Sequence, residues 1–245
     1  MGGLPDTASD HRDARASHGL QSERCRTVFD LGFALSIIPK LLVASIITIE
    51  ATIVSFAISV LGGVVVLSLC RSPLRPVAAA SRLAAEFIRN TPLLVQLYFL
   101  YFIGPQFGLV LSPLLTGILG LSIHYSCFMA EAYRGGLEAI PRGQWDAAVA
   151  LNYSRLSIYR RVVLPQMLPA MIPIGGNFLI YMFKDTPFLA AISVTELMHT
   201  ASQIGADRFQ YLEPITLCGL IFLILSVMTA AALGRLEKWV GRGWR

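Results

Sequence analysis

The 245-residue sequence is poor in charged residues and lacks the patterns that mark metal or nucleotide chemistry. Asp, Glu, Lys and Arg make up 14% of the chain, against about 25% in soluble domains, whereas hydrophobic residues make up 55%. Four histidines occur without an HExxH pattern and four cysteines without a CxxC pair, so we expect no metal site and no disulfides. Because no GxxxxGK[ST] loop and no nucleophile–base pair is present, we expect no bound ATP and no catalytic residues.

The hydrophobic residues lie in blocks that predict a multi-pass membrane protein. Leu41–Cys70 forms a block of about 30 residues whose only charge is Glu50, and roughly 20 residues suffice to cross a bilayer. Four further spans are predicted at 74–103, with a kink at Thr91-Pro92, and at 113–133, 169–192 and 214–233. We therefore expect an all-α integral membrane domain with about five transmembrane helices over residues 36–245, after a polar, disordered tail at 1–35.

Basic residues predict how these helices are oriented. About 13 Lys and Arg lie on the side that holds segments 71–89 and 134–168 and the C-terminus, against about six on the other side. Since the basic-rich side of a membrane protein is cytoplasmic, we expect the N-terminus outside and the C-terminus inside. The same placement at the ends of apolar blocks explains the net charge of +5 without a nucleic-acid partner.

The cytoplasmic loop at 134–168 predicts two short helices. The first runs over about residues 144–151 and is rich in alanine, and Asn152 suits the left-handed position that ends a helix. Ser154 can cap a second helix to about Val162, which Pro165 is expected to end. The small side chains of Ala147 and Ala148 suit insertion into a partner's groove, although spacing alone equally allows an interfacial turn without a partner.

The loop resembles the EAA signature of ATP-binding-cassette importer permeases, in which Glu-Ala-Ala is followed three residues later by Gly and then by Leu-Pro. Here Asp replaces the Glu and Asn replaces the Gly, and the segments at 89–96 and 140–144 resemble the polar amino-acid uptake branch. The positions that the resemblance assigns to coupling with the ATPase are Gly143, Gln144, Asp146, Ala147, Ala148, Asn152, Leu164 and Pro165.

Three further segments are most similar to ectoine and hydroxyectoine permeases, namely 48–52, 121–125 and 183–187. The resemblance implies a MetI-like fold in a bacterial inner membrane and import of a small zwitterionic solute such as ectoine. Import of a polar amino acid by the same machinery is the alternative, and an ion-coupled secondary transporter is the rival from another class. No internal repeat of the kind common in secondary transporters is evident.

The resemblance also implies the partners. The loop would be the coupling helix that sits in a cleft of a separate ATPase subunit, which uses the ATP, so the chain itself would not be an enzyme. A second permease subunit, identical or different, would complete the channel in the lipid bilayer, and an extracytoplasmic solute-binding protein would deliver the solute.

Polar residues inside the predicted spans are candidates for the solute pathway, because such residues are costly in a membrane. The candidates are Glu50, His124, Glu131, Asn177, Tyr181 and Lys184. Lys184 or Asn177 could meet the solute's carboxylate, and Glu50 or Glu131 its cationic group, whereas Asp185 is expected to point away from Lys184. Pairing between helices, or snorkelling of Lys184 to an interface, is the alternative for these residues.

Overall fold

The computed structural model describes residues 29–242, so most of the predicted tail lies outside it. Within that range every regular element is helical. The α-helices are α2 (Leu31–Cys70), α3 (Arg75–Asn90), α4 (Leu93–Tyr98), α5 (Pro113–Glu138), α6 (Arg142–Ala150), α7 (Arg155–Ile158), α8 (Leu164–Asp185), α9 (Leu197–Arg208) and α10 (Leu212–Arg242). Two π-helical turns, Phe99–Ile103 and Tyr159–Val163, and two 3-10 turns, Gly104–Phe107 and Thr186–Ile192, join them.

Four segments of the described chain are long and apolar enough to cross a membrane: α2, α5, the continuous helix Arg155–Ile192, and α10 as far as Lys238. The predicted second span is not one kinked helix, because Thr91 takes an extended conformation that separates α3 from α4. Among the described residues, the predicted set of about five helices thus corresponds to four full-length candidates and one shorter apolar helical segment, Leu93–Phe107.

The first helix begins ten residues earlier than the predicted span. Asp30 caps α2 by accepting a hydrogen bond from the backbone N–H of Phe33 at 3.1 Å, so the helix starts at Leu31, before the predicted domain boundary at residue 36. Pro39 lies inside the helix, although proline usually ends one. The predicted span began just after Pro39 and Lys40, and both of these residues are exposed.

The core forms where α2 packs against α5. A Cβ atom on Gly63 would lie 2.5 Å from the Cβ of Met129, so only glycine allows this approach of the two helices. The Ser55 hydroxyl donates to the carbonyl of Ile118 across the same contact at 3.2 Å. A cluster of fully buried side chains continues from here to the segment after α8, through Leu97, Leu121 and Leu189.

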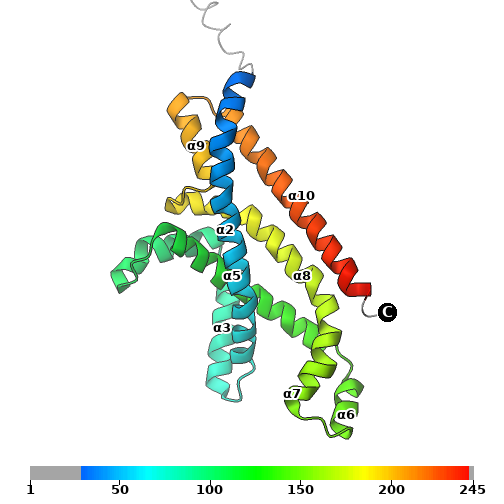
Figure 1. Ribbon diagram of the computed structural model, residues 1–245. Helices are drawn as coiled ribbons and strands as arrows, with labels where there is room; N and C mark the ends of the chain where they lie inside the picture. The colour runs from blue at the N-terminus through cyan, green and yellow to red at the C-terminus, as the bar shows by residue number, and fades with distance from the viewer. Residues whose placement is uncertain (1–28, 243–245) are drawn as a thin grey trace, which may run out of the picture.

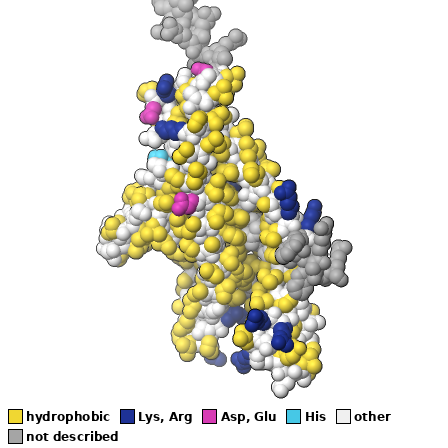
Figure 2. All heavy atoms as spheres, in the orientation of Figure 1, with side chains coloured by type: hydrophobic (Ala, Val, Ile, Leu, Met, Phe, Trp, Pro, Cys, Tyr) yellow, Lys and Arg dark blue, Asp and Glu magenta, His cyan; other side chains and the backbone are white. Residues whose placement is uncertain are grey.

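The two ends of the helical bundle carry different elements (Figure 1). The start of α2 and helix α9 lie at one end, whereas the turn between α2 and α3 and the helices α6 and α7 lie at the other. On the face drawn in Figure 2, Lys and Arg side chains gather toward the second end, below a broad hydrophobic region. Two of the segments predicted to be cytoplasmic, 71–89 and 134–168, therefore lie at the same end.

Candidate functional site

The short helix α6 ends as its sequence predicts. Asn152 has a φ of 57°, in the left-handed region. Its N–H donates to the carbonyl of Val149 at 2.9 Å, and the N–H of Tyr153 donates to that of Ala148 at 3.2 Å. These two bonds form a Schellman motif, which uses two carbonyls that the end of the helix would otherwise leave free. The predicted role of Asn152 in the turn is confirmed.

The second short helix starts as predicted but does not end at Pro165. Ser154 caps α7 by accepting from the N–H of Ser157 at 3.3 Å. The chain then continues through the π-helical turn Tyr159–Val163 into α8, where Pro165 sits in the first turn. The helix thus continues past Pro165, directly after a π-helical turn that interrupts the regular α-helical hydrogen bonding, so the prediction of a stop is wrong.

The two alanines of the signature face opposite ways. Ala148 is 2% exposed and packs in a cluster with Ile158 and Val163, which fixes α6 against the start of the long helix. Ala147 is exposed. The small side chain that is available for insertion into a partner's groove is therefore that of Ala147 and not that of Ala148, because residues next to each other on a helix lie on different faces.

The exposed side of the loop is apolar with charges around it. Val149, Leu151 and Leu156 are 64%, 68% and 74% exposed. Gly143, Gln144 and Asp146 are also exposed, Leu164 is 39% exposed, and Pro165 is half-buried. Large exposed apolar side chains rimmed by polar residues are typical of a protein–protein interface. The loop thus offers a surface of the kind that a partner subunit would cover.

Three of the predicted pathway residues line one cavity of about 350 Å³ between α5 and α8, namely His124, Tyr181 and Lys184. The other lining residues are Tyr125, Phe128, Phe178 and Asp185. Asp185 was expected to point away from Lys184, and this is wrong. The hydroxyl of Tyr125 donates to Oδ2 of Asp185 at 2.7 Å and so holds the carboxylate at the cavity.

A second cavity of about 640 Å³ shares His124 and Asp185 with the first. Its other wall is the break between α3 and α4, where residues 89–94 lie, together with Phe188. One imidazole and one carboxylate therefore belong to the linings of both cavities.

Gln96 determines how His124 is held. The Gln96 amide nitrogen donates to the carbonyls of Ile88 and Thr91 at 2.7 and 3.1 Å and to the Thr91 hydroxyl at 2.7 Å. The amide oxygen must then face Nδ1 of His124, which lies at 3.2 Å. Because that oxygen only accepts, this contact requires a proton on Nδ1 of His124.

The other pathway candidates lie elsewhere. Glu131 is paired with Arg89 at 3.2 Å and also with Arg134, so pairing between helices, the alternative weighed for it, describes its contacts. Glu50 on α2 and Asn177 on α8 are exposed and line neither of the two cavities. The pathway candidates therefore separate into a group around His124 and three residues apart from it.

Sequence reasoning missed Gln96, Tyr125 and Asp185 as members of the site. Gln96 and Tyr125 lay within segments already noted for their resemblance to permeases, and that was the available signal. Asp185 was not chosen, because ideal helical geometry places it and Lys184 on different faces. It nevertheless lines the same cavity, where its carboxylate accepts the hydrogen bond from Tyr125.

A family model described as the binding-protein-dependent transport system inner membrane component matches residues 58–242. The chain is 39% identical over 202 residues to the probable amino-acid ABC transporter permease protein y4tG of Sinorhizobium fredii, covering 82% of this chain and 87% of that protein. It is 34% identical over 203 residues to the arginine transport system permease protein ArtQ of Bacillus subtilis, covering 81% and 92%.

Solved structures of transporters show the same fold. A crystal structure of an amino acid ABC transporter with histidines superposes with a TM-score of 0.81 at 28% identity, covering 86% of this chain and 99% of the other. The inward-facing MetNI methionine ABC transporter gives a TM-score of 0.70 at 21% identity, covering 82% and 96%. The predicted MetI-like fold is confirmed by these similarities.

Proposed function

The chain belongs to the family of binding-protein-dependent transport system inner membrane components, and on this premise we propose that it forms the channel for an amino acid in an ATP-driven importer. It is a multi-pass inner membrane permease subunit and not an enzyme, since ATP hydrolysis in such systems takes place on a separate ATPase. The amino-acid permeases among its relatives support this substrate class.

The observation that carries the choice of solute is the pair of opposite charges at one cavity. Lys184 and Asp185 both line the space of about 350 Å³, and Lys184 has no ion pair among the described residues. A free ammonium group suits the α-carboxylate of an amino acid, and the Asp185 carboxylate suits its α-ammonium group. Phe128 and Phe178 provide an apolar wall for the rest of the solute.

Import of ectoine in particular is not supported by the relatives, which are named for amino acids. A cyclic zwitterion would also need a cation and an anion on the protein, so the charge pair alone does not separate ectoine from an amino acid. The relatives named for arginine and for L-cystine favour the amino acid. We therefore place the polar amino acid first, ahead of ectoine.

The partners follow from the exposed loop. The ATPase subunit would cover Ala147 and the apolar side chains near it, while a second permease would cover part of the exposed apolar surface of the bundle. A binding protein would dock at the opposite end, near α9. In this arrangement the chain binds no cofactor of its own, and the N-terminus faces the outside of the cell.

ATP-dependent uptake into proteoliposomes tests the proposal. The permease is reconstituted with its ATPase and binding protein and is offered labelled arginine, cystine, glutamine, glutamate and ectoine. We expect uptake of one of the amino acids, with Lys184→Gln or Asp185→Asn raising KM about tenfold or more, because each removes a charge-assisted hydrogen bond. The exposed Lys40 gives the matched control Lys40→Gln. Uptake driven by an ion gradient without the ATPase would overturn the proposal, and uptake of ectoine alone would overturn the choice of solute.

A further inference from the structure

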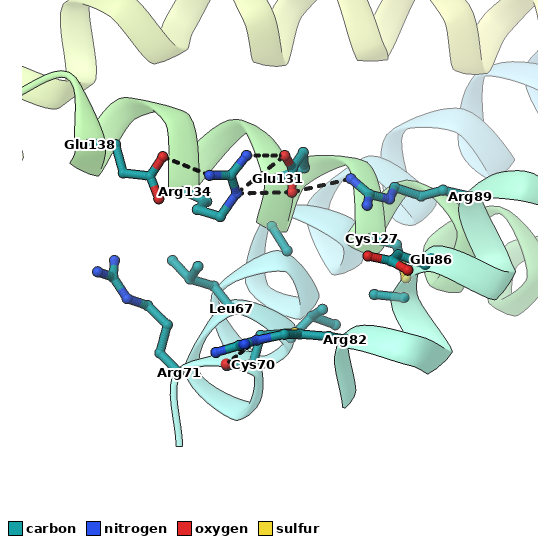
Figure 3. Close-up of a pocket in the computed structure, with 13 residues that line it drawn as sticks. Leu67, Cys70, Arg71, Arg82, Glu86, Arg89, Cys127, Glu131, Arg134 and Glu138 are labelled. Atoms are coloured by element: carbon teal, nitrogen blue, oxygen red, sulfur yellow. Dashed lines mark hydrogen bonds and ion pairs between the residues drawn. The ribbon is translucent and has the colours of Figure 1, made fainter. Parts of the chain in front are cut away.

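A third cavity lies at the arginine-rich end of the bundle and shares Arg89 with the cavity beside the break between α3 and α4 (Figure 3). It has a volume of about 510 Å³ and lies between the end of α2, helix α3 and the second half of α5. Its charged lining residues are Arg71, Arg82, Glu86, Arg89, Glu131, Arg134 and Glu138. Among them are four arginines and three glutamates, so the lining carries one more positive than negative charge.

The charges divide into a paired and an unpaired group. Arg134 bridges Glu131 and Glu138, and Arg89 also binds Glu131 at 3.2 Å, so these four side chains neutralise one another (Figure 3). Arg71, Arg82 and Glu86 make no ion pair with any described residue. The excess positive charge of the cavity therefore belongs to this second group.

The free guanidinium groups lie near the end of α2. The Arg82 side chain extends toward that end, and its Nε donates to the carbonyl of Cys70 at 3.1 Å, next to Arg71 (Figure 3). This single bond leaves the terminal nitrogens of Arg82 free for a ligand. Two guanidinium groups beside one cavity repel each other unless an anion lies between them, and a phosphate group suits their planar fork geometry.

The outer surface of α3 indicates what surrounds the cavity. Leu83 and Phe87 are 70% and 68% exposed and face away from it, whereas Arg82, Glu86 and Arg89 face into it. A helix with exposed apolar residues outside and charges inside lies against lipid tails. On the neighbouring helix α2, Val65 is 58% exposed, so apolar surfaces flank the cavity on two helices.

We propose that this cavity binds the headgroup of one anionic phospholipid, with the phosphodiester on Arg71 and Arg82. One phosphodiester balances the single excess positive charge, and an uncharged headgroup such as glycerol can donate hydroxyl hydrogen bonds to Glu86. The acyl chains lie along the exposed apolar side chains of α2 and α3. The site rests on membrane insertion alone and is independent of which solute is transported.

Retention of lipid by the purified permease–ATPase complex tests this site. The complex is exchanged into nanodiscs that contain equal amounts of phosphatidylglycerol, phosphatidylethanolamine and phosphatidylcholine and is then extracted in detergent, after which bound lipid is measured by mass spectrometry. We expect about one phosphatidylglycerol per permease chain. Arg71→Gln should lower its retention about tenfold, because it removes a charge-assisted contact. Arg75 is exposed in the same turn but outside the cavity, so Arg75→Gln should retain the lipid.

Three results would overturn the site. They are equal retention of the three lipids, equal loss of lipid in Arg71→Gln and Arg75→Gln, and displacement of phosphatidylglycerol by millimolar inorganic phosphate, which would identify a site for the free anion. Since Arg71 is exposed and makes no ion pair with the described residues, Arg71→Gln should assemble normally, as size-exclusion chromatography of the complex would show. The charge-conserving Arg71→Lys should recover most of the retention.

Discussion

Replacing Gln96 by leucine should affect both the stability of the permease and its affinity for solute. The Gln96 amide nitrogen satisfies the carbonyls of Ile88 and Thr91 at the end of α3. Leucine would leave the carbonyl of Thr91 without a side-chain donor, whereas the carbonyl of Ile88 would keep the longer bond from the Thr91 hydroxyl at 3.2 Å. Because one unsatisfied buried polar group costs about 1–3 kcal/mol and this site is half-buried, the expected loss is about 1–2 kcal/mol.

The second effect concerns the imidazole of His124. Without the Gln96 oxygen at 3.2 Å, the ring loses the contact that holds Nδ1 and therefore its orientation beside the cavity. We expect KM for the solute to rise about tenfold, since one well-placed hydrogen bond is worth about 1.4 kcal/mol in such a comparison. Gln96→Glu keeps an acceptor for His124 but loses the donors, so it should lower stability with a smaller effect on KM.

Two measurements separate these effects. Thermal unfolding of the purified complex reports the loss of stability, and uptake into proteoliposomes at varied solute concentration reports KM. Gln203 is exposed on α9, so Gln203→Leu serves as the matched control. If Gln96→Leu unfolded at the wild-type temperature and transported with the wild-type KM, the assigned role of the Gln96 hydrogen bonds would be refuted.

Two further predictions concern the loop. Asn152→Ala should weaken the α6 turn by about 1–2 kcal/mol, because alanine is strained at a φ of 57°, whereas Asn152→Gly should retain it, as thermal unfolding and co-purification of the ATPase would show. Ala147→Trp should abolish co-purification of the ATPase without lowering the unfolding temperature, since Ala147 is exposed. The same change at Ala84, which is exposed on α3, should leave co-purification intact, and a normal complex with Ala147→Trp would contradict the docking surface.

The sequence predicted the features that depend on local chemistry. The helical class, the left-handed turn at Asn152 and the cap at Ser154 each follow from the preferences of a few adjacent residues, and the structure confirms them. The break after Asn90 and the helix that continues past Pro165 were not predicted. Both depend on contacts made over a distance, such as the Gln96 bonds to α3, or on a π-helical turn that periodicity does not reveal.

The site was predicted only in part for the same reason. His124, Tyr181 and Lys184 lie together because α5 and α8 pack against each other, but helical spacing alone could not show which faces meet. Glu131 was predicted to line the solute pathway because it is a charged residue within a predicted span. Its pairing with Arg89 depends on the position of α3. Facing relations between helices are set by tertiary packing, which a single sequence does not display.

The helix that continues from Arg155 to Asp185 connects the loop of α6 and α7 with the solute cavity. Its first turns belong to the loop that a partner would hold, and its last turn carries Lys184 and Asp185 at the solute cavity. The helix contains a π-helical turn and, within α8, Pro169 and Pro173, and features of this kind bend a helix. A shift of the loop that tilts α8 would move this charge pair relative to His124, which lies on the separate helix α5.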